Sequence, residues 1–302
     1  MRVFLTGATG FIGSALVPEL INAGHQVLGL ARSDAGAQAL AAAGAQVQRG
    51  DLEDLESLRS GASQSDAVIH TAFIHDFSKF VENCEIDRRA IEALGAALEG
   101  SKRPLLVTSG LGLLVRGRTA TEDDMPPPPN PATYPRASEA AGDALLARGV
   151  NVSVVRLPQV HNTVKQGLVS YSIAVARQKG VSAYLGDGLN RWAAVHVLDA
   201  ARLYRLALEK TADAKAEPGA RYHAVAEEGV SARDIAEVIG RGLNVPIVSM
   251  TPEEAAGHFG WLAMFAGLDI VASSTQTQQR LGWRPIGPGL IADLEQMRYS
   301  EA

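Results

Sequence analysis

Three glycines near the N-terminus have the spacing that brings a protein backbone onto a phosphate group. Gly7, Gly10 and Gly13 form the pattern T-G-x-x-G-x-x-G, directly after the short apolar run 3–5. The first glycine permits a tight turn, the second lets the backbone approach a pyrophosphate, and the third lets a helix pack on the preceding strand. The N-terminus of that helix offers unpaired N–H groups and a positive dipole end. The sequence therefore predicts a dinucleotide-binding loop.

A second set of residues could move a proton. Tyr134 follows the proline-rich segment 126–131 and precedes a helical pattern, and Ser109 ends an apolar strand. A tyrosine can act as an acid or a base when its surroundings adjust a pKa that is normally about 10. His75, Asp76 and His161 are alternative acids or bases, although a solvated loop pair is the simpler interpretation of His75 and Asp76.

Residues after the second and third apolar runs could select the cofactor. NAD-binding folds usually place an acidic residue after the second strand, whereas this chain has Arg32 and Ser33 there. An arginine suits the 2′-phosphate of NADP. Asp51 and Leu52 resemble the pair that contacts the adenine in dinucleotide-binding folds, and Asp51 could equally be only a turn residue.

The elements that position these residues alternate in type through the first half of the chain. Strands are predicted at 2–6, 26–31, 46–49, 67–71, 105–109 and 152–156, with helices at 11–22, 35–43, 81–99 and 138–148. Such βαβ repetition favours an α/β fold with a doubly wound parallel sheet. We predict a Rossmann domain over 1–157 and a smaller, mainly substrate-binding region over 158–302, with elements of about 190–226 returning to the sheet. Later helices are predicted at 164–179, at 199–210 with Asp199 as N-cap, and at 231–241 with Ser231 as N-cap.

Composition narrows the functional class. The 302 residues are 46% hydrophobic and 20% charged, with a net charge of −5 and no basic block, so nucleic-acid binding is not expected. The single cysteine, Cys84, predicts no internal disulfide, and no metal is expected. The first strand begins at residue 2, and no apolar stretch reaches the roughly 20 residues of a membrane span. We expect a cytoplasmic protein without a membrane partner.

With these motifs the chain resembles the extended short-chain dehydrogenase/reductase superfamily, which includes NAD-dependent sugar epimerases and dehydratases. The landmarks are residues 6–13, 50–52, 68–72, 107–110, 156–161, 186–188, 195–199 and 281–285. The resemblance implies a catalytic Tyr-x-x-x-Lys pair and a Ser or Thr at the end of the fifth strand. Here the position of the lysine is Ser138, and the position of the hydroxyl aligns more naturally with Gly110 than with Ser109. The chain thus resembles an atypical member.

The resemblance also assigns roles residue by residue. Tyr134 and Ser109 are the expected catalytic residues. The expected cofactor-binding residues are Thr6, Gly7, Thr9, Gly10, Phe11, Ile12, Gly13, Arg32, Ser33, Asp51, Leu52, Thr71, Ala72, Phe73, Thr108, Tyr134, Leu157, Pro158 and Val160. Further candidates are Lys165 as a substitute cation, Arg191 as a phosphate clamp, and Trp192 with the segment 258–265 as pocket walls. A homodimer through exposed helices is expected from the resemblance alone.

Three functions fit these observations. The leading hypothesis is an NADP-dependent oxidoreductase, with NAD as an alternative cofactor, that reduces a small carbonyl substrate with Tyr134 as proton donor. The second is a sugar-nucleotide epimerase or dehydratase in which bound NAD is reduced and reoxidised within one turnover. The third is a non-catalytic dinucleotide sensor, which the absence of the lysine favours.

Overall fold

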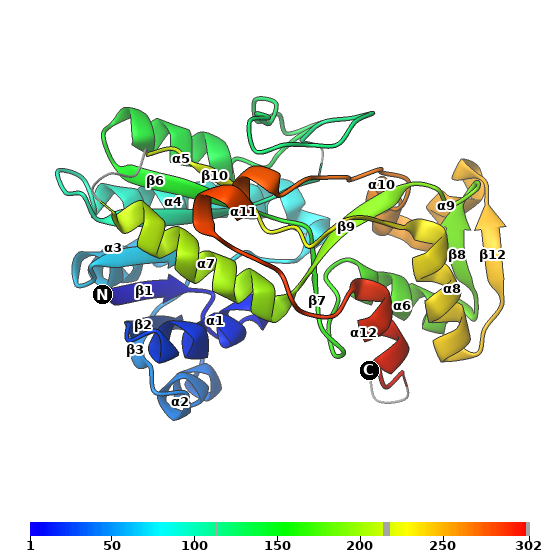
Figure 1. Cartoon of the computed structure of the whole chain (residues 1–302), viewed down its shortest axis with the longest axis horizontal. Helices are drawn as coiled ribbons and strands as arrows, with labels where there is room; N and C mark the ends of the chain where they lie inside the picture. Colours follow the sequence, from blue (N-terminus) through cyan, green and yellow to red (C-terminus); the bar gives the residue numbers. More distant parts are fainter. Residues whose placement is uncertain (113, 214–217, 300–302) are drawn as a thin grey trace.

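Seven parallel strands form the central sheet, in the order β3, β2, β1, β4, β5, β6, β10 (Figure 1). The computed structural model describes residues 1–112, 114–213 and 218–299. The strands are β1 (Arg2–Thr6), β2 (Gln26–Ala31), β3 (Gln46–Arg49), β4 (Ala67–His70), β5 (Pro104–Gly110), β6 (Asn151–Leu157) and β10 (Arg221–His223). The strand order reverses between β1 and β4, which is where ligands bind in open parallel sheets. The predicted Rossmann-type fold is confirmed.

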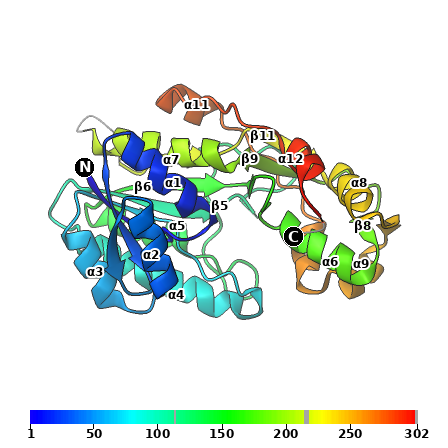
Figure 2. The ribbon, with the colours of Figure 1, turned by 90° about the horizontal axis from the view of Figure 1, so that it is seen from below.

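Helices cover both faces of this sheet because its strands are apolar on both sides. In β1, Val3 and Leu5 pack into one cluster while Phe4 packs into the other. The first cluster lies under α1 (Phe11–Asn22), α2 (Asp34–Ala42) and α7 (Val197–Ala212). The second lies under α3 (Leu55–Ser63), α4 (Phe80–Ala96) and α5 (Ser138–Ala147). Figure 2 shows α1 and α7 on the side of the sheet opposite α3 and α4.

The C-terminal region builds two small sheets beside the carboxyl edge of the large one. Strands β7 (Gln159–His161), β9 (Arg191–His196) and β11 (Glu227–Ser231) form one, and β8 (Ser182–Leu185) with β12 (Ile247–Met250) form the other. The helical elements are α6 (Val169–Lys179), α8 (Ala232–Leu243), α9 (Pro252–Phe259), η2 (Gly260–Leu262), α10 (Ala263–Ala266), α11 (Thr275–Leu281) and α12 (Leu290–Gln296). Within 190–226, α7 and β10 accompany the large sheet, whereas β9 pairs with β7 and β11.

Two predicted helix starts were wrong for local reasons. Helix α6 begins at Val169 rather than at 164, because the side chain of Asn162 accepts the amides of Val164 and Lys165 and holds them in a turn. Helix α7 begins at Val197 with His196 as its N-cap, not at Asp199.

One helix was not predicted. Helix α3 contains Gly61, and its serines and glycine weaken the helical signal. The glycine is needed because a Cβ there would lie 2.4 Å from the ring of Phe4. In the described part of the chain, no helix is long and apolar enough to cross a bilayer.

Candidate functional site

The glycine turn lies at the carboxyl ends of β1 and β4, where the strand order reverses. Gly7 has φ +69°, and a Cβ there would lie 2.7 Å from both the amide nitrogen of Ala72 and Oγ1 of Thr71. Thr71 also donates its hydroxyl to the carbonyl of Thr6 at 2.8 Å. The turn is therefore held against the segment that follows β4, and only glycine fits its first position.

Gly10 and Gly13 have different surroundings. Gly10 borders open space that a ligand could fill, whereas Gly13 is needed for close packing of the helix on the turn. Gly10 is the exposed N-cap of α1, with no side-chain cap, and a Cβ there would approach only the carbonyl of Gly7, at 3.1 Å. A Cβ on Gly13 would lie 2.1 Å from that same oxygen. The first amides of α1, from Phe11 and Ile12, have no partner within the helix. This open, positively polarised turn fits a pyrophosphate.

Polar and charged groups surround the N-terminus of α2. The hydroxyl of Ser33 accepts the amide of Gly36 at 3.1 Å and caps this helix. Arg49 donates to the carbonyl of Ser33 at 2.5 Å and to Asp34 at 2.8 Å. Arg32 is exposed, and among the described residues its guanidinium has no hydrogen bond or ion pair. These groups fit a phosphate, and Thr9 lies beside them, with its methyl carbon 3.1 Å from a Cβ built on Gly36.

Arg49 was not among the predicted residues. Only the register of the sheet brings it to this place, because β2 and β3 are parallel and Ala31 pairs with Arg49. The arginine therefore ends its strand beside the end of β2, next to Arg32. Two arginines, not one, therefore follow or end neighbouring strands at this edge of the sheet.

Several other predicted cofactor residues have clear structural roles. Asp51 accepts the amides of Glu53 and Asp54 at 2.9 and 3.0 Å, so it forms the turn before α3. Leu52 and Val160 are buried in the two clusters that cover the sheet. Thr108 donates to the carbonyl of His70 at 2.6 Å and contacts the hydroxyl of Tyr204 at 2.7 Å. Their contacts with a cofactor stay predictions.

Tyr134 lies in the loop before α5, whereas the resemblance implies a tyrosine and a lysine on one helix. Its backbone forms a two-way bridge with Asn130, with N···O distances of 2.6 and 2.8 Å. The residue after it is Pro135, and a residue that precedes proline is disfavoured in helical conformation. Helix α5 begins only at Ser138, so Tyr134 and Ser138 do not share a helix face.

Ser138, at the position of the expected lysine, is buried in a polar chain. Its hydroxyl donates to Asp87 at 2.6 Å, and the other carboxyl oxygen of Asp87 lies 3.0 Å from Nε2 of His70. Nδ1 of His70 lies 2.8 Å from the hydroxyl of Thr6, just before the glycine turn. Each of these four side chains is at most 4% exposed. These four hydrogen-bonded side chains tie α4 and α5 to the glycine turn and leave no room for a lysine at residue 138.

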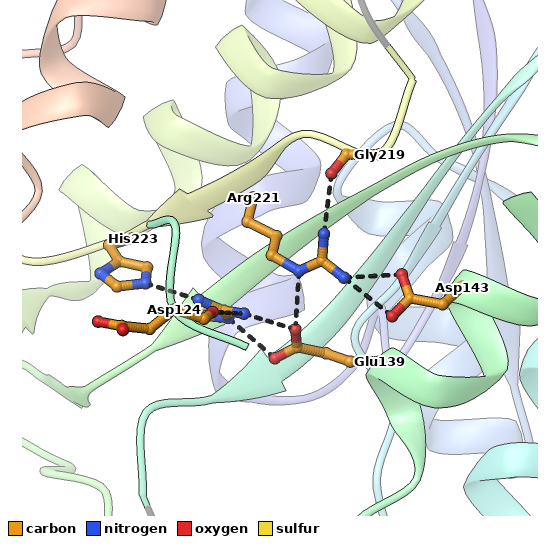
Figure 3. Close-up of polar contacts among 7 residues, drawn as sticks. Asp124, Glu139, Asp143, Gly219, Arg221 and His223 are labelled. Carbon is orange, nitrogen blue, oxygen red and sulfur yellow. Dashed lines mark hydrogen bonds and ion pairs between the residues drawn. The ribbon is translucent and has the colours of Figure 1, made fainter. Parts of the chain in front are cut away.

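Ser109 lies beside a buried ionic network whose residues come from α5, β6 and β10. It is 2% exposed and lies beside Glu139, whose carboxylate accepts from Arg156 at 2.8 and 2.9 Å and from Arg221 at 3.1 Å (Figure 3). Burial alone would raise the pKa of Glu139, but the hydrogen bonds and charge of Arg156 outweigh it and lower the pKa overall. Arg156 itself is 0% exposed.

Arg136, like Arg49, was not among the predicted site residues. Its guanidinium carbon lies 5.1 Å from the ring centre of Phe73 and 5.8 Å from that of Phe80. It also lies 4.0 Å from the Cβ that Gly110 lacks, at the end of β5. Burial raises the pKa of Tyr134, and the charge of Arg136 opposes this rise. The segment 134–138 thus brings a cation to the carboxyl edge of the sheet, two residues after the buried phenol of Tyr134.

His75 lies near the charges of Arg136 and Lys165. Desolvation lowers the pKa of His75, and the charges of Arg136 and Lys165 lower it further, although part of the residue is exposed to solvent. Nζ of Lys165 lies 5.9 Å from the ring centre of Phe11, above the first turn of α1. The cation is therefore beside the phosphate loop.

An aromatic cluster joins the two regions of the protein beside these residues. Phe77, in the short helix η1 (Phe77–Lys79), stacks on Trp261 with ring centres 4.5 Å apart and an angle of 10°. Tyr171 lies 5.0 Å from Trp261, and Phe265 lies 6.0 Å from Phe77. Part of the segment 258–265 therefore contributes apolar surface next to His75.

The remaining candidates are engaged elsewhere. Asp76 caps η1 and accepts the hydroxyl of Ser78 at 2.6 Å. His161 is fully buried, with Nδ1 2.7 Å from Asp293 on α12. Arg191 forms an exposed ion pair with Asp269 at 3.0 Å, and Trp192 donates to the carbonyl of Leu268 at 3.1 Å, in the core of the C-terminal region. Among the described residues, no three His, Cys, Asp or Glu side chains are placed to hold a metal.

Comparison with known proteins places this geometry in a family. The NAD dependent epimerase/dehydratase family matches residues 3–222. An uncharacterized protein of Schizosaccharomyces pombe, C2A9.02, is 47% identical over 99% of this chain and 100% of its own. A sterol-4-alpha-carboxylate 3-dehydrogenase (decarboxylating) of Dictyostelium discoideum is 28% identical over 69% of this chain and 68% of its own. The structure of the UDP-glucose 4-epimerase of Thermus thermophilus with NAD has a TM-score of 0.75, at 21% identity over all of both chains. The chain belongs to the NAD-dependent epimerase/dehydratase family, within the extended short-chain dehydrogenase/reductase superfamily.

Proposed function

We propose that this protein is an NADP-dependent reductase of a small carbonyl compound. The observation that carries the proposal is the buried phenol of Tyr134, on which the charge of Arg136 acts, together with the guanidinium of Arg136 at the end of β5. Burial raises the pKa of Tyr134 above its ordinary value, so at neutral pH the side chain keeps its proton. A neutral phenol is a proton donor, which reduction needs, and a poor base for oxidation.

The residues present fit the dinucleotide. Gly10 and the N-terminus of α1 would hold the pyrophosphate, with Lys165 above the same turn. Arg32 and Arg49 would hold the 2′-phosphate of NADP beside the N-terminus of α2. Two guanidinium groups there favour NADP over NAD, because Arg pairs well with phosphate oxygens. When bound, the reduced cofactor supplies the hydride of the reaction.

The protein supplies the proton and the electrostatics. Tyr134 donates its phenolic proton to the substrate oxygen and regains one from solvent. In the superfamily a lysine four residues later assists the tyrosine, but Ser138 holds that position here. The charge of Arg136 lowers the pKa of Tyr134 against the effect of burial, so it takes over part of this role. The direction of the pKa shift predicts that oxidation of an alcohol should accelerate as pH rises toward the pKa of Tyr134.

Replacement of Tyr134 by phenylalanine tests this assignment. Tyr134→Phe removes only the hydroxyl and should lower kcat for reduction by about 10²–10⁴, the usual share of acid–base catalysis. The Kd for NADPH should stay close to that of the wild type. Tyr184→Phe, on β8 in the C-terminal region, is the matched control. If Tyr134→Phe turns over substrate at the wild-type rate, another group donates the proton.

A further inference from the structure

We propose that Arg136 is a catalytic residue that hydrogen-bonds the carbonyl oxygen of the substrate and stabilises the negative charge that develops on it. This inference rests on the proposed reductase function and adds to it the group that polarises the carbonyl. The loop that presents Tyr134 also presents Arg136, two residues later. One segment therefore carries both the proposed proton donor and the positive charge, and the charge of Arg136 acts on the phenol of Tyr134.

The guanidinium is held in place by aromatic rings rather than by carboxylates. It lies over Phe73 at 5.1 Å and Phe80 at 5.8 Å, and Phe73 follows closely on the strand end at which the glycine turn is clamped. Contacts with ring faces attract a cation while they leave the N–H groups of its edge free to donate. The side chain is thus oriented before a substrate arrives.

No protein acceptor uses those N–H groups in the described part of the chain. Arg136 is half-buried and has neither a hydrogen bond nor an ion pair there. The carboxylates of the adjoining helices are occupied: Asp87 binds His70 and Ser138, and Glu139 binds Arg156 and Arg221. A half-buried guanidinium without an acceptor fits a ligand oxygen that carries negative charge.

The guanidinium lies beside the position at the end of β5 where the superfamily resemblance places a hydroxyl. Gly110 ends the strand where the superfamily resemblance places a serine or threonine. A Cβ on Gly110 would meet only the carbonyl of Leu157 at 3.9 Å and the guanidinium carbon of Arg136 at 4.0 Å, both ordinary contacts. The guanidinium therefore borders the space that a hydroxyl would use.

The step balances with the groups named. The carbonyl carbon gains a C–H bond by accepting a hydride from the reduced nicotinamide dinucleotide, and the π electron pair of the C=O bond moves to the oxygen. Arg136 donates hydrogen bonds to this oxygen, and Tyr134 transfers its proton to it to give the alcohol. The dinucleotide leaves oxidised. Donors fixed on a developing oxyanion typically contribute about 10²–10³ in rate.

The test is a rescue experiment in the full-length protein. Arg136→Gln should lower kcat for carbonyl reduction by about 10²–10³. The KM for the carbonyl and the Kd for NADPH, measured by fluorescence titration, should change by less than about threefold. Arg136→Lys keeps the charge without the planar fork and should recover only part of kcat. The double variant Arg136→Gln with Gly110→Ser places a hydroxyl at the end of β5. Its kcat should be at least about tenfold higher than that of Arg136→Gln alone.

Each outcome decides the proposal. Circular dichroism and NADPH binding test whether the variants fold. If Arg136→Gln does not fold, Arg136→Lys gives the same comparison. A kcat within threefold of the wild type in a folded Arg136 variant would overturn the catalytic role. A loss confined to KM, and only for substrates that carry a carboxylate, would also overturn it, because Arg136 would then be an anion-binding group. If none of the carbonyl compounds tested supports NADPH oxidation by the wild type, the proposed function itself fails.

Discussion

Replacement of Gly10 by valine separates the cofactor site from the stability of the fold. Gly10 is exposed, and its backbone is extended, with φ −80° and ψ 177°, a conformation that valine adopts readily. The added Cβ would approach only the carbonyl of Gly7, at 3.1 Å. Exchange of a glycine N-cap for an apolar residue should cost less than about 1 kcal/mol of stability. Gly10→Val should therefore fold.

The same side chain would occupy the space that the pyrophosphate needs above α1. Loss of one charge-assisted hydrogen bond costs about 1.5–3 kcal/mol, or about ten- to 150-fold in affinity, and the blocked turn should lose more than one such bond. Calorimetric titration with NADPH measures the affinity, and thermal unfolding measures stability. Gly13→Ala is the counterpart, because its Cβ would lie 2.1 Å from the Gly7 carbonyl and should destabilise the fold by about 1–3 kcal/mol or more. A folded Gly10→Val protein with wild-type NADPH affinity would refute this placement of the phosphate.

Three further predictions follow from particular side chains. Arg32→Ala should lower NADPH affinity by about ten- to 100-fold and leave NADH affinity unchanged, as measured by paired titrations; an equal effect on both cofactors would exclude a 2′-phosphate contact. Glu139→Gln leaves Arg156 buried and charged, so urea unfolding should show a loss of about 3–5 kcal/mol. Because the folded-state pKa of Glu139 is lowered, the wild type should keep this stability above the ordinary pKa of about 4.3 and lose it as pH falls through the lower folded value, a dependence that the variant should lack. Ser138→Lys should destabilise the protein rather than raise turnover, because residue 138 is 1% exposed and bonded to Asp87; a stable variant with faster turnover would contradict this.

The sequence predicted the large sheet well because its strands are buried on both faces and read as apolar runs. Glycines that end or open elements, such as Gly7 and Gly24, carry their own conformational signal. The start of α7 was misplaced because two residues compete for the cap. Asp199 is a strong N-cap type, but its carboxylate is used by the amides of Ile286 and Gly287, far along the chain. Tertiary contacts of this kind leave no local trace.

Site residues could be predicted where they belong to one short sequence motif. They could not be predicted where the folded sheet and its loops bring distant residues together. The glycine turn lies within thirteen consecutive residues, so its place follows from spacing. Arg49 reaches Arg32 only through the register of β2 and β3, and Arg136 reaches Gly110 only through the loop that leads into α5. Ser138 could be recognised as a missing lysine, but its bond to Asp87 depends on the packing of α4 against α5.

The most direct test of the central claim is the stoichiometry of NADPH oxidation with a panel of small aldehydes and ketones. The purified protein is incubated with a known amount of NADPH, and nicotinamide absorbance and the alcohol product are measured together. The account predicts one alcohol formed for each NADPH consumed, with a slower reaction when NADH replaces NADPH. Conversion of a sugar nucleotide with a retained dinucleotide and no net consumption of NADPH would contradict the account, as would cofactor binding without turnover of any carbonyl.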